Sequence, residues 1–167
     1  MKFHQLFKAA IHEPKKLAAF RLLKIGKVFQ YVFLFVTLFT VISFIRYLVG
    51  DTVLFEASPE LMEHGKTVGW IIYPIAFLLQ LVISTFYIFL RISIFGYIGV
   101  LLLKLLKRRG DYRFMWNTAA IAITVPILMT IVLDFFPVAS DYSMVITSMI
   151  HTIYIGAAAN YYPKMPR

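Results

Sequence analysis

The chain contains no cysteine among its 167 residues, so it can form no disulfide bond and bind no metal through thiolate ligands. Charge is scarce as well, because Asp, Glu, Lys and Arg make up 15% of the residues, against about 25% in soluble domains. Acids are the scarcer kind: 8 stand against 17 Lys and Arg, which gives a formal net charge of +9. A single domain that is 60% hydrophobic cannot hide its apolar surface from water. We therefore expect an integral membrane protein.

Sequence motifs of catalysis and cofactor binding are also missing. The four histidines, at positions 4, 12, 64 and 151, have neither the H-x-x-x-H nor the HExxH spacing of zinc sites. The serines lie in no G-x-S-x-G, and neither G-x-x-x-x-G-K-[ST] nor GxGxxG occurs. The basic residues flank apolar segments and accompany no stacking platform or groove-reading motif for nucleic acid. We expect a protein that is not an enzyme, with no metal, cofactor or nucleic-acid partner.

What the sequence does have is a long apolar stretch at residues 70–106, in which Arg91 and Lys104 are the only charges. As a helix it would be about 55 Å long, whereas the hydrocarbon core is about 30 Å thick. Three arrangements fit: one long tilted or kinked helix, a span followed by an interfacial helix, or two short spans with a turn near Arg91. Gly96 and Gly99 would permit bending or close packing. We favour one crossing, because two would place the basic run 107–109 outside.

Three further apolar runs, at residues 28–49, 115–136 and 142–162, complete the expected spans, while the long stretch supplies a span within 68–106. Each is long enough to cross the bilayer as a helix. Pro126 lies at the centre of its run and predicts a kink, because its ring removes a helical hydrogen bond. The sequence thus predicts an all-α integral membrane protein with a four-span helical bundle. The last run is rich in small and polar residues, which favours a place inside the bundle.

Charge distribution predicts the orientation. Fourteen of the 17 Lys and Arg residues lie in residues 1–27, 104–113 and 163–167, whereas five of the eight acids lie in the other two connections and Asp134 lies at the adjoining end of the run 115–136. Because basic connections stay in the cytoplasm, we expect a multi-pass cell-membrane protein with both termini cytoplasmic. The loop Gly50–Lys66 is then external and too short for a domain with its own core. Within it, Ser58 and Pro59 resemble the N-cap and first residue of a short helix.

Residues 1–27 form a basic amphipathic segment that precedes the transmembrane domain at 28–167. We expect it to be retained and not cleaved as a signal peptide, since no small-residue cleavage site follows a short apolar run. Apolar residues recur at helical spacing, and Pro14 interrupts the helix. The segment either lies on an anionic cytoplasmic leaflet or merely orients the first span, and the two interpretations are compatible. Its candidate lipid-surface contacts are Lys8, Lys15, Lys16, Arg21, Lys24 and Lys27.

Three runs resemble a known family. The run F-x-x-A-I-H-E-P-K-K-L-A-A-F-R-L-L-K-I-G-K precedes an aromatic-rich span, and F-G-Y-I-G-V-L-L-L-K and G-D-Y-R-F-M-W-N follow later. This layout is similar to that of the MalA-like membrane proteins of Gram-positive bacteria, a family of unknown function associated with maltodextrin utilisation. It is more distantly similar to Yip-type multi-span proteins. The resemblance implies a membrane accessory protein and supplies no catalytic residue. The relatives have a much larger external domain between the first two spans.

Ionisable residues at membrane depth are the candidate site, because burying them there is expensive. His151 lies near the middle of its span, where it could relay protons or bind a ligand; a hydrogen bond to a neighbouring helix is the favoured alternative. Arg91 could contact an anionic substrate, although an interfacial position or a local ion pair is favoured. Gln80 is expected to join helices or to lie at an interface, and Asp134 lies near the outer end of its span. The cytoplasmic basic loop contributes Lys107, Arg108, Arg109 and Arg113.

Three functions remain open. The leading hypothesis is a non-catalytic accessory or regulatory subunit of a larger membrane complex. The second is a small transporter or channel, which would require a homo-oligomer because four spans are few for a pathway. The third is a lipid-binding protein of the membrane surface that uses residues 1–27. The expected partners are the bilayer, with its anionic cytoplasmic leaflet, and a membrane-protein partner or further copies of the chain.

Overall fold

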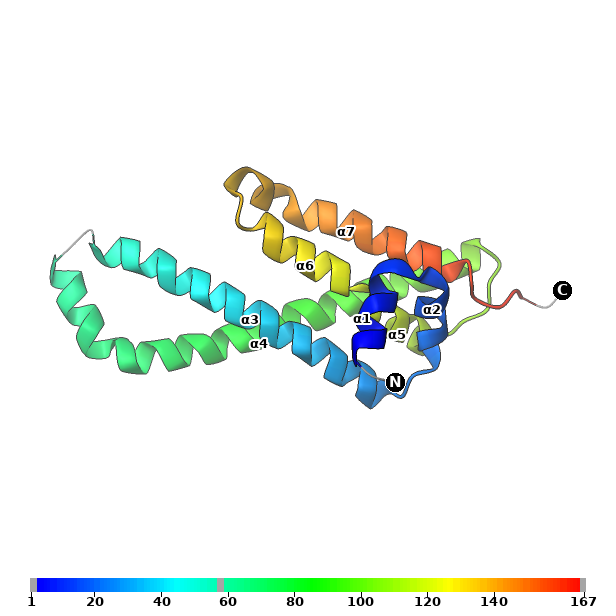
Figure 1. Ribbon diagram of the computed structural model, residues 1–167, viewed down its shortest axis with the longest axis horizontal. Helices are drawn as coiled ribbons and strands as arrows, with labels where there is room; N and C mark the ends of the chain where they lie inside the picture. The colour runs from blue at the N-terminus through cyan, green and yellow to red at the C-terminus, as the bar shows by residue number, and fades with distance from the viewer. Residues whose placement is uncertain (1–2, 57–58, 166–167) are drawn as a thin grey trace. The chain divides into compact units, whose positions relative to one another are not determined.

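The computed structural model describes the backbone of residues 3–56 and 59–165, and the side chains of 4–11, 13–49, 70–136 and 138–165. This part of the chain is helical and contains no strand (Figure 1). The all-α expectation is therefore confirmed. The elements are α1 (Phe3–His12), α2 (Pro14–Ala19), the 3-10 helix η1 (Phe20–Leu22), α3 (Ile25–Glu56), α4 (Pro59–Leu105), α5 (Tyr112–Ala122), α6 (Thr124–Leu133) and α7 (Pro137–Ala159).

Among the described residues, four helical segments are long and apolar enough to cross a membrane, which agrees with the expected number of spans. They indicate a multi-pass membrane protein. Their bounds differ from the expected ones by a few residues, because the helices do not end where the apolar runs do. The segments are Ile25–Val49, Trp70–Leu105, Tyr112–Leu133 (which includes the α5–α6 break) and Val138–Ala159.

Helix α4 is continuous through Arg91, so the alternative of two short spans with a turn there is wrong. The single long helix is the arrangement that the structure adopts. The external loop expected at residues 50–66 is also largely wrong, since α3 continues to Glu56 and α4 begins at Pro59. The start of α4, PELMEHGK at 59–66, contains Leu, Glu and Met, which favour helix over loop. Pro59 opens α4 as expected, while the proposed cap Ser58 lies outside the described residues.

The chain divides into two compact units, one formed by residues 1–35 and 89–167 and the other by Val36–Ile88. The expected boundary at residue 27, between the basic segment and the transmembrane domain, stays a prediction. The second unit pairs the end of α3 with the start of α4 through aromatic side chains. Phe39 stacks on Tyr87 with 6.0 Å between ring centroids, and Phe44 meets Phe77 edge-on at 5.2 Å. Aromatic contacts of this geometry stabilise helix pairs beyond simple area burial.

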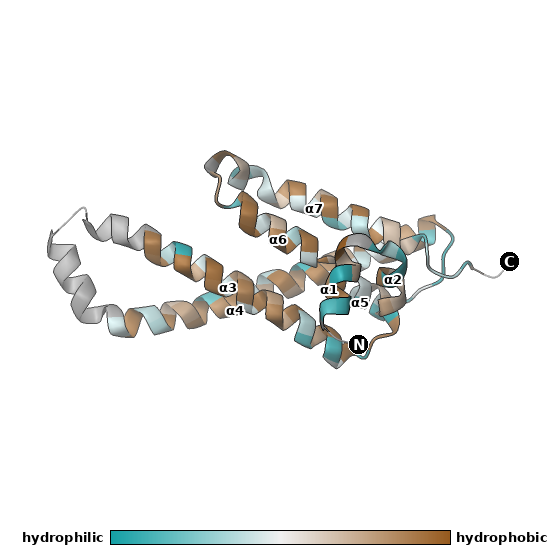
Figure 2. Cartoon of the chain, viewed as in Figure 1, coloured by the Kyte–Doolittle hydropathy of each residue, from teal (hydrophilic) through white to brown (hydrophobic). Residues whose placement is uncertain are grey.

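The first unit, which we call the packed unit, places α6 beside α7 and α5 against α7 and η1 (Figure 1). Helices α1 and α2 contact α5 to α7. In Figure 2 the teal, hydrophilic residues of this unit gather on α1, α2 and the C-terminal segment, whereas α6 is mainly brown. Its fully buried large side chains are Tyr31, Tyr162, Phe35, Leu17, Ile92, Leu103, Met115, Ile121, Ile123, Ile127 and Ile155.

The kink expected from Pro126 appears as a break between α5 and α6 at Ile123, three residues earlier. Proline has no N–H, and its ring collides with the carbonyl group four residues before it, here that of Ala122. The backbone hydrogen bonds on either side of the break are kept: Ile123 N–H donates to Ala119 O at 3.0 Å, and Ile127 N–H donates to Ile123 O at 2.9 Å. The break therefore disturbs only the turn that the proline ring affects.

Candidate functional site

Arg91 lies inside the packed unit, with 6% of its surface exposed. Its Nη2 donates a hydrogen bond to Thr147 Oγ1 of α7 at 2.9 Å. The Thr147 hydroxyl in turn donates to the carbonyl oxygen of Ser143 at 2.7 Å, and Thr130 Oγ1 of α6 lies 3.5 Å from it. The guanidinium group thus joins α4 to α7, a contact that the sequence did not predict, while its expected position at the membrane interface stays a prediction.

His151 is fully buried, and its Nε2 lies 3.1 Å from the carbonyl oxygen of Ala119 in α5. Since a carbonyl oxygen only accepts, Nε2 must carry a proton, and Nδ1 of the neutral ring is then an acceptor. Nδ1 has no hydrogen-bond partner among the described residues. The favoured interpretation of a histidine bonded to a neighbouring helix is therefore confirmed.

Phe95 brings these two ionisable residues into one buried polar cluster, which we define as Arg91, Phe95, Thr147 and His151. The His151 ring stacks on Phe95 with centroids 4.3 Å apart and an interplanar angle of 24°. The guanidinium carbon of Arg91 lies 5.8 Å from the centroid of the same ring. The sequence did not predict this proximity. The feature of the sequence that could have indicated a polar cluster was the four-residue spacing of Ser143, Thr147 and His151, which places them on one helix face.

The other two intramembrane candidates lie elsewhere. Gln80 is half-buried and belongs to the unit Val36–Ile88. Asp134 is half-buried at the C-terminal end of α6, where its backbone N–H donates to Thr130 O at 2.9 Å. Among the described side chains, no three His, Asp or Glu residues come together in a way that could hold a metal ion.

Helix α5 fastens the N-terminal segment through Asn117, a role that sequence analysis missed. The Asn117 Nδ2 donates to the backbone carbonyl groups of Arg21 and Leu23, each at 3.1 Å. One buried amide thus satisfies two carbonyl groups of a segment 94 and 96 residues earlier in the chain. Because buried carbonyl groups without partners are costly, this pair of bonds fixes η1 on α5.

The C-terminal segment is fastened to the same helix through Tyr162. Its hydroxyl lies 2.7 Å from Thr118 Oγ1 and donates to Phe114 O at 3.2 Å. The Arg21 guanidinium carbon lies 4.8 Å from the centre of the tyrosine ring. Burial raises the pKa of Tyr162 to about 12, although the Thr118 hydrogen bond and the Arg21 charge act in the opposite direction. The buried ring therefore joins the two ends of the chain.

The expected lipid-contact segment is folded onto protein. On α1, Leu6, Ala9 and Ala10 are buried, so these apolar residues pack inside the unit and are not free to enter the bilayer. The Tyr154 hydroxyl of α7 donates to the carbonyl oxygen of Ile11 at 3.1 Å and ties α1 to the last span. The basic side chains of the segment face outward: Lys8, Lys15, Lys16, Lys24 and Lys27 are exposed, and Arg21 is half-buried.

The basic loop after α4 pairs with the C-terminal segment. Arg108 donates from Nη1 to Tyr162 O at 2.9 Å, and Arg109 N–H donates to Pro163 O at 2.8 Å. Met165 N–H donates to Lys107 O at 3.1 Å, where Lys107 has a φ of 53°. This conformation is uncommon for a residue with a Cβ and is held here by the paired segment. Lys107, Arg109 and Arg113 remain exposed, and Arg108 is half-buried.

Comparison with known families places this geometry in context. The DUF1189 family, described as proteins of unknown function, matches residues 56–158, which is more than half of the chain. The chain belongs to the DUF1189 family. The match includes Arg91, Asn117 and His151, but it begins after α1, α2 and η1. Among curated proteins and solved structures, no match to the chain is found. The resemblance to MalA-like and Yip-type proteins stays a prediction.

Proposed function

We propose that the protein is a non-catalytic accessory or regulatory subunit of a larger membrane complex, with both termini in the cytoplasm of a bacterial cell. The observation that supports it is the folded basic end of the packed unit. This end consists of the exposed lysines of α1 to the start of α3, the basic loop, and Lys164. Glu13 and Asp111 are the acids among the described side chains of these segments.

A fixed array of cations suits recognition of an acidic protein surface. Residues 3–23 are held by Asn117, Tyr154 and Tyr162. Because the backbone is already ordered, binding sacrifices less conformational entropy than binding by a loose basic tail. Opposite charge on a partner would speed association and fix its orientation, with a strong dependence on salt.

The test of this proposal is co-purification from native membranes in a mild detergent, followed by mass spectrometry. A stoichiometric partner is expected with the unmodified chain and is lost in the charge-reversal variant Lys15→Glu/Lys24→Glu/Lys27→Glu. The matched control, Lys15→Arg/Lys24→Arg/Lys27→Arg, keeps the charges and retains the partner. A homogeneous homo-oligomer without a partner, or equal recovery from both variants, would contradict the proposal.

Orientation is tested in the cysteine-free chain with single cysteines at exposed positions. Asp111 and Asp141 are both exposed. Asp111 directly precedes α5, and Asp141 lies near the start of α7, so the two residues lie at opposite ends of the α5–α7 segment. With the proposed topology, an impermeant thiol reagent applied outside intact cells labels Asp141→Cys and spares Asp111→Cys until the cells are opened. Labelling of Asp111→Cys in intact cells would refute the cytoplasmic placement of the basic end.

A second candidate is a small oligomeric transporter or channel, which the buried polar cluster favours. Charges at membrane depth often line substrate or proton pathways. This function predicts proton or ion flux in proteoliposomes under a potassium diffusion potential, followed with a pH-sensitive dye. Arg91→Ala and His151→Ala would abolish flux with assembly intact, whereas Val145→Ala on an exposed face of α7 would not. Absence of flux in the unmodified oligomer would exclude a proton pathway.

A further inference from the structure

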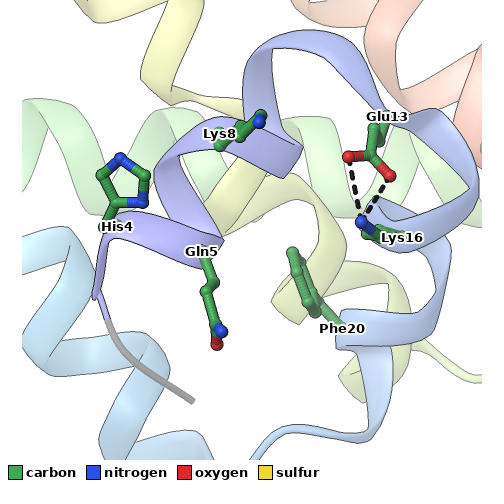
Figure 3. Close-up of a pocket in the computed structure, with 6 residues that line it drawn as sticks. All are labelled: His4, Gln5, Lys8, Glu13, Lys16 and Phe20. Carbon is green, nitrogen blue, oxygen red and sulfur yellow. Dashed lines mark hydrogen bonds and ion pairs between the residues drawn. The ribbon is translucent and has the colours of Figure 1, made fainter.

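Helices α1, α2 and η1 line a partly open pocket of about 430 Å³ at the basic end of the packed unit. This volume lies within the roughly 300–1,000 Å³ range of small-ligand sites. Figure 3 shows side chains from all three elements and from the connection between α1 and α2 around it. The lining residues are His4, Gln5, Lys8, Glu13, Lys16 and Phe20.

The polar lining is rich in hydrogen-bond donors. Lys8 and Lys16 present ammonium groups, Gln5 presents an amide, and His4 presents an imidazole. Figure 3 shows Glu13 joined to Lys16 on one side of the pocket, with Nζ 3.0 Å from Oε1 and 2.8 Å from Oε2. Phosphate oxygens accept such donors well, because charge-assisted hydrogen bonds are the stronger ones.

The net charge of the residues that line the pocket indicates which kind of phosphate group it would bind. Two ammonium groups and one carboxylate leave one positive charge in the pocket when histidine is counted as neutral. A phosphodiester carries one negative charge and matches this balance, whereas a doubly charged monoester would leave an excess negative charge. The buried ring of Phe20 adds an apolar surface for the carbon atoms beside the phosphate.

The place of the pocket in the unit favours a lipid as the source of that group. Ile11, in the helix that supplies His4, Gln5 and Lys8, is bonded to Tyr154. Tyr154 belongs to the candidate span Val138–Ala159, and α1 packs against α5 and α6 of the candidate span Tyr112–Leu133, so α1 lies beside spanning segments. We propose that this pocket binds the phosphodiester group of an anionic phospholipid headgroup. A soluble glycerophosphodiester shares the chemistry and is separated from the lipid by experiment.

The opposed effects of Lys8 and Glu13 make the proposal testable. Lys8→Gln removes a cation that lines the pocket and is expected to weaken binding about tenfold, the scale of one charge-assisted hydrogen bond. Glu13→Gln frees Lys16 from its ion pair and is expected to strengthen binding. A role of Glu13 in folding alone would not produce tighter binding. Lys24→Gln is the matched control, because Lys24 is an exposed lysine of the same segment that does not line the pocket.

The measurement is native mass spectrometry of the full chain in detergent, with an equimolar mixture of dioleoyl phosphatidylglycerol and dioleoyl phosphatidylcholine. Preferential retention of phosphatidylglycerol, lost in Lys8→Gln, kept in Lys24→Gln and raised in Glu13→Gln, supports the lipid site. Equal losses in Lys8→Gln and Lys24→Gln would reduce the effect to general surface charge and overturn the proposal.

A competition experiment tests whether the bound phosphodiester group comes from a lipid or from a soluble molecule. Glycerophosphoglycerol that binds as tightly as the lipid and displaces it would overturn the lipid assignment in favour of a soluble phosphodiester. Displacement by inorganic phosphate alone would overturn the match to a singly charged diester. Phosphatidylglycerol that stays bound when each competitor is added in excess supports the proposal. Lipid retention is measured on the isolated chain, so its outcome is independent of whether a partner protein co-purifies.

Discussion

Gly99 of α4 lies where three helices meet, and its replacement by alanine is the sharpest test of the packed unit. A Cβ at this position would lie 2.4 Å from Met115 Cγ and 2.6 Å from its Sδ in α5. It would also lie 2.9 Å from Ile155 Cγ2 in α7. Carbon atoms in contact normally stay about 3.5–4.0 Å apart. Since Met115 and Ile155 are fully buried, neither side chain has open space to enter.

The magnitude follows from a matched comparison with Gly156 of α7, where an added Cβ would meet nothing within 4 Å. Both changes replace a helical glycine by alanine and share a gain in helix propensity of up to about 1 kcal/mol. Only Gly99→Ala also incurs overpacking, which typically costs about 1–3 kcal/mol. We therefore expect Gly99→Ala to be less stable than Gly156→Ala by about 1–3 kcal/mol.

Thermal unfolding in detergent, followed by tryptophan fluorescence, is the assay. For a chain of this length 1 kcal/mol shifts Tm by about 2–4 °C, so Gly99→Ala should melt several degrees below Gly156→Ala. Shortening the obstructing side chain with Met115→Ala should make the double variant more stable than the sum of the two single effects. Equal melting temperatures for the two glycine variants, or a strictly additive double variant, would refute the assigned helix packing.

Three further predictions concern buried hydrogen bonds within the packed unit. Asn117→Leu leaves two carbonyl groups of the N-terminal segment without their donor, so we expect a loss of about 1–3 kcal/mol and faster hydrogen exchange near η1. Tyr31→Phe removes the 2.6 Å contact between the tyrosine hydroxyl and Thr124 Oγ1, and we expect denaturant titration to show a loss of about 1 kcal/mol. The raised pKa of Tyr162, about 12, predicts stability that is fully present below about pH 10 and falls as pH rises from 10 to 12. The melting temperature of Tyr162→Phe, which cannot ionise there, should fall less over this interval.

Sequence patterns predicted the helical features that arise within a short stretch of chain. The four spans follow from apolar runs, and the interruption near Pro126 follows from the missing N–H and the bulk of one ring. The same approach was largely wrong for residues 50–66, which it treated as a connecting loop with a short helix beginning at Pro59. Acidic residues are compatible with a helix, and α3 continues from Gly50 to Glu56 although Gly, Asp, Thr and Val in this segment are weak helix formers.

Candidate residues were found more readily than their environment. His151 stood out as an ionisable residue in an apolar run, and its hydrogen bond to a neighbouring helix was the favoured expectation. Arg91 also stood out, but its burial was missed because its position along α4 suggested a membrane interface. Asn117 and Tyr162 gave little signal, since a single amide or phenol near a helix end is common and its partners are distant in the chain.

The sequence by itself determined that this is an all-α, multi-pass membrane protein with four apolar spans, because hydropathy and helical spacing are properties of consecutive residues. Tertiary structure decided that residues 3–23 pack on α5–α7 and that Arg91 and His151 meet at Phe95. It also created the pocket of α1, α2 and η1. Arg91 and Thr147 are 56 residues apart, and Asn117 reaches back 96 residues. Such contacts depend on how whole helices pack, which no local pattern specifies.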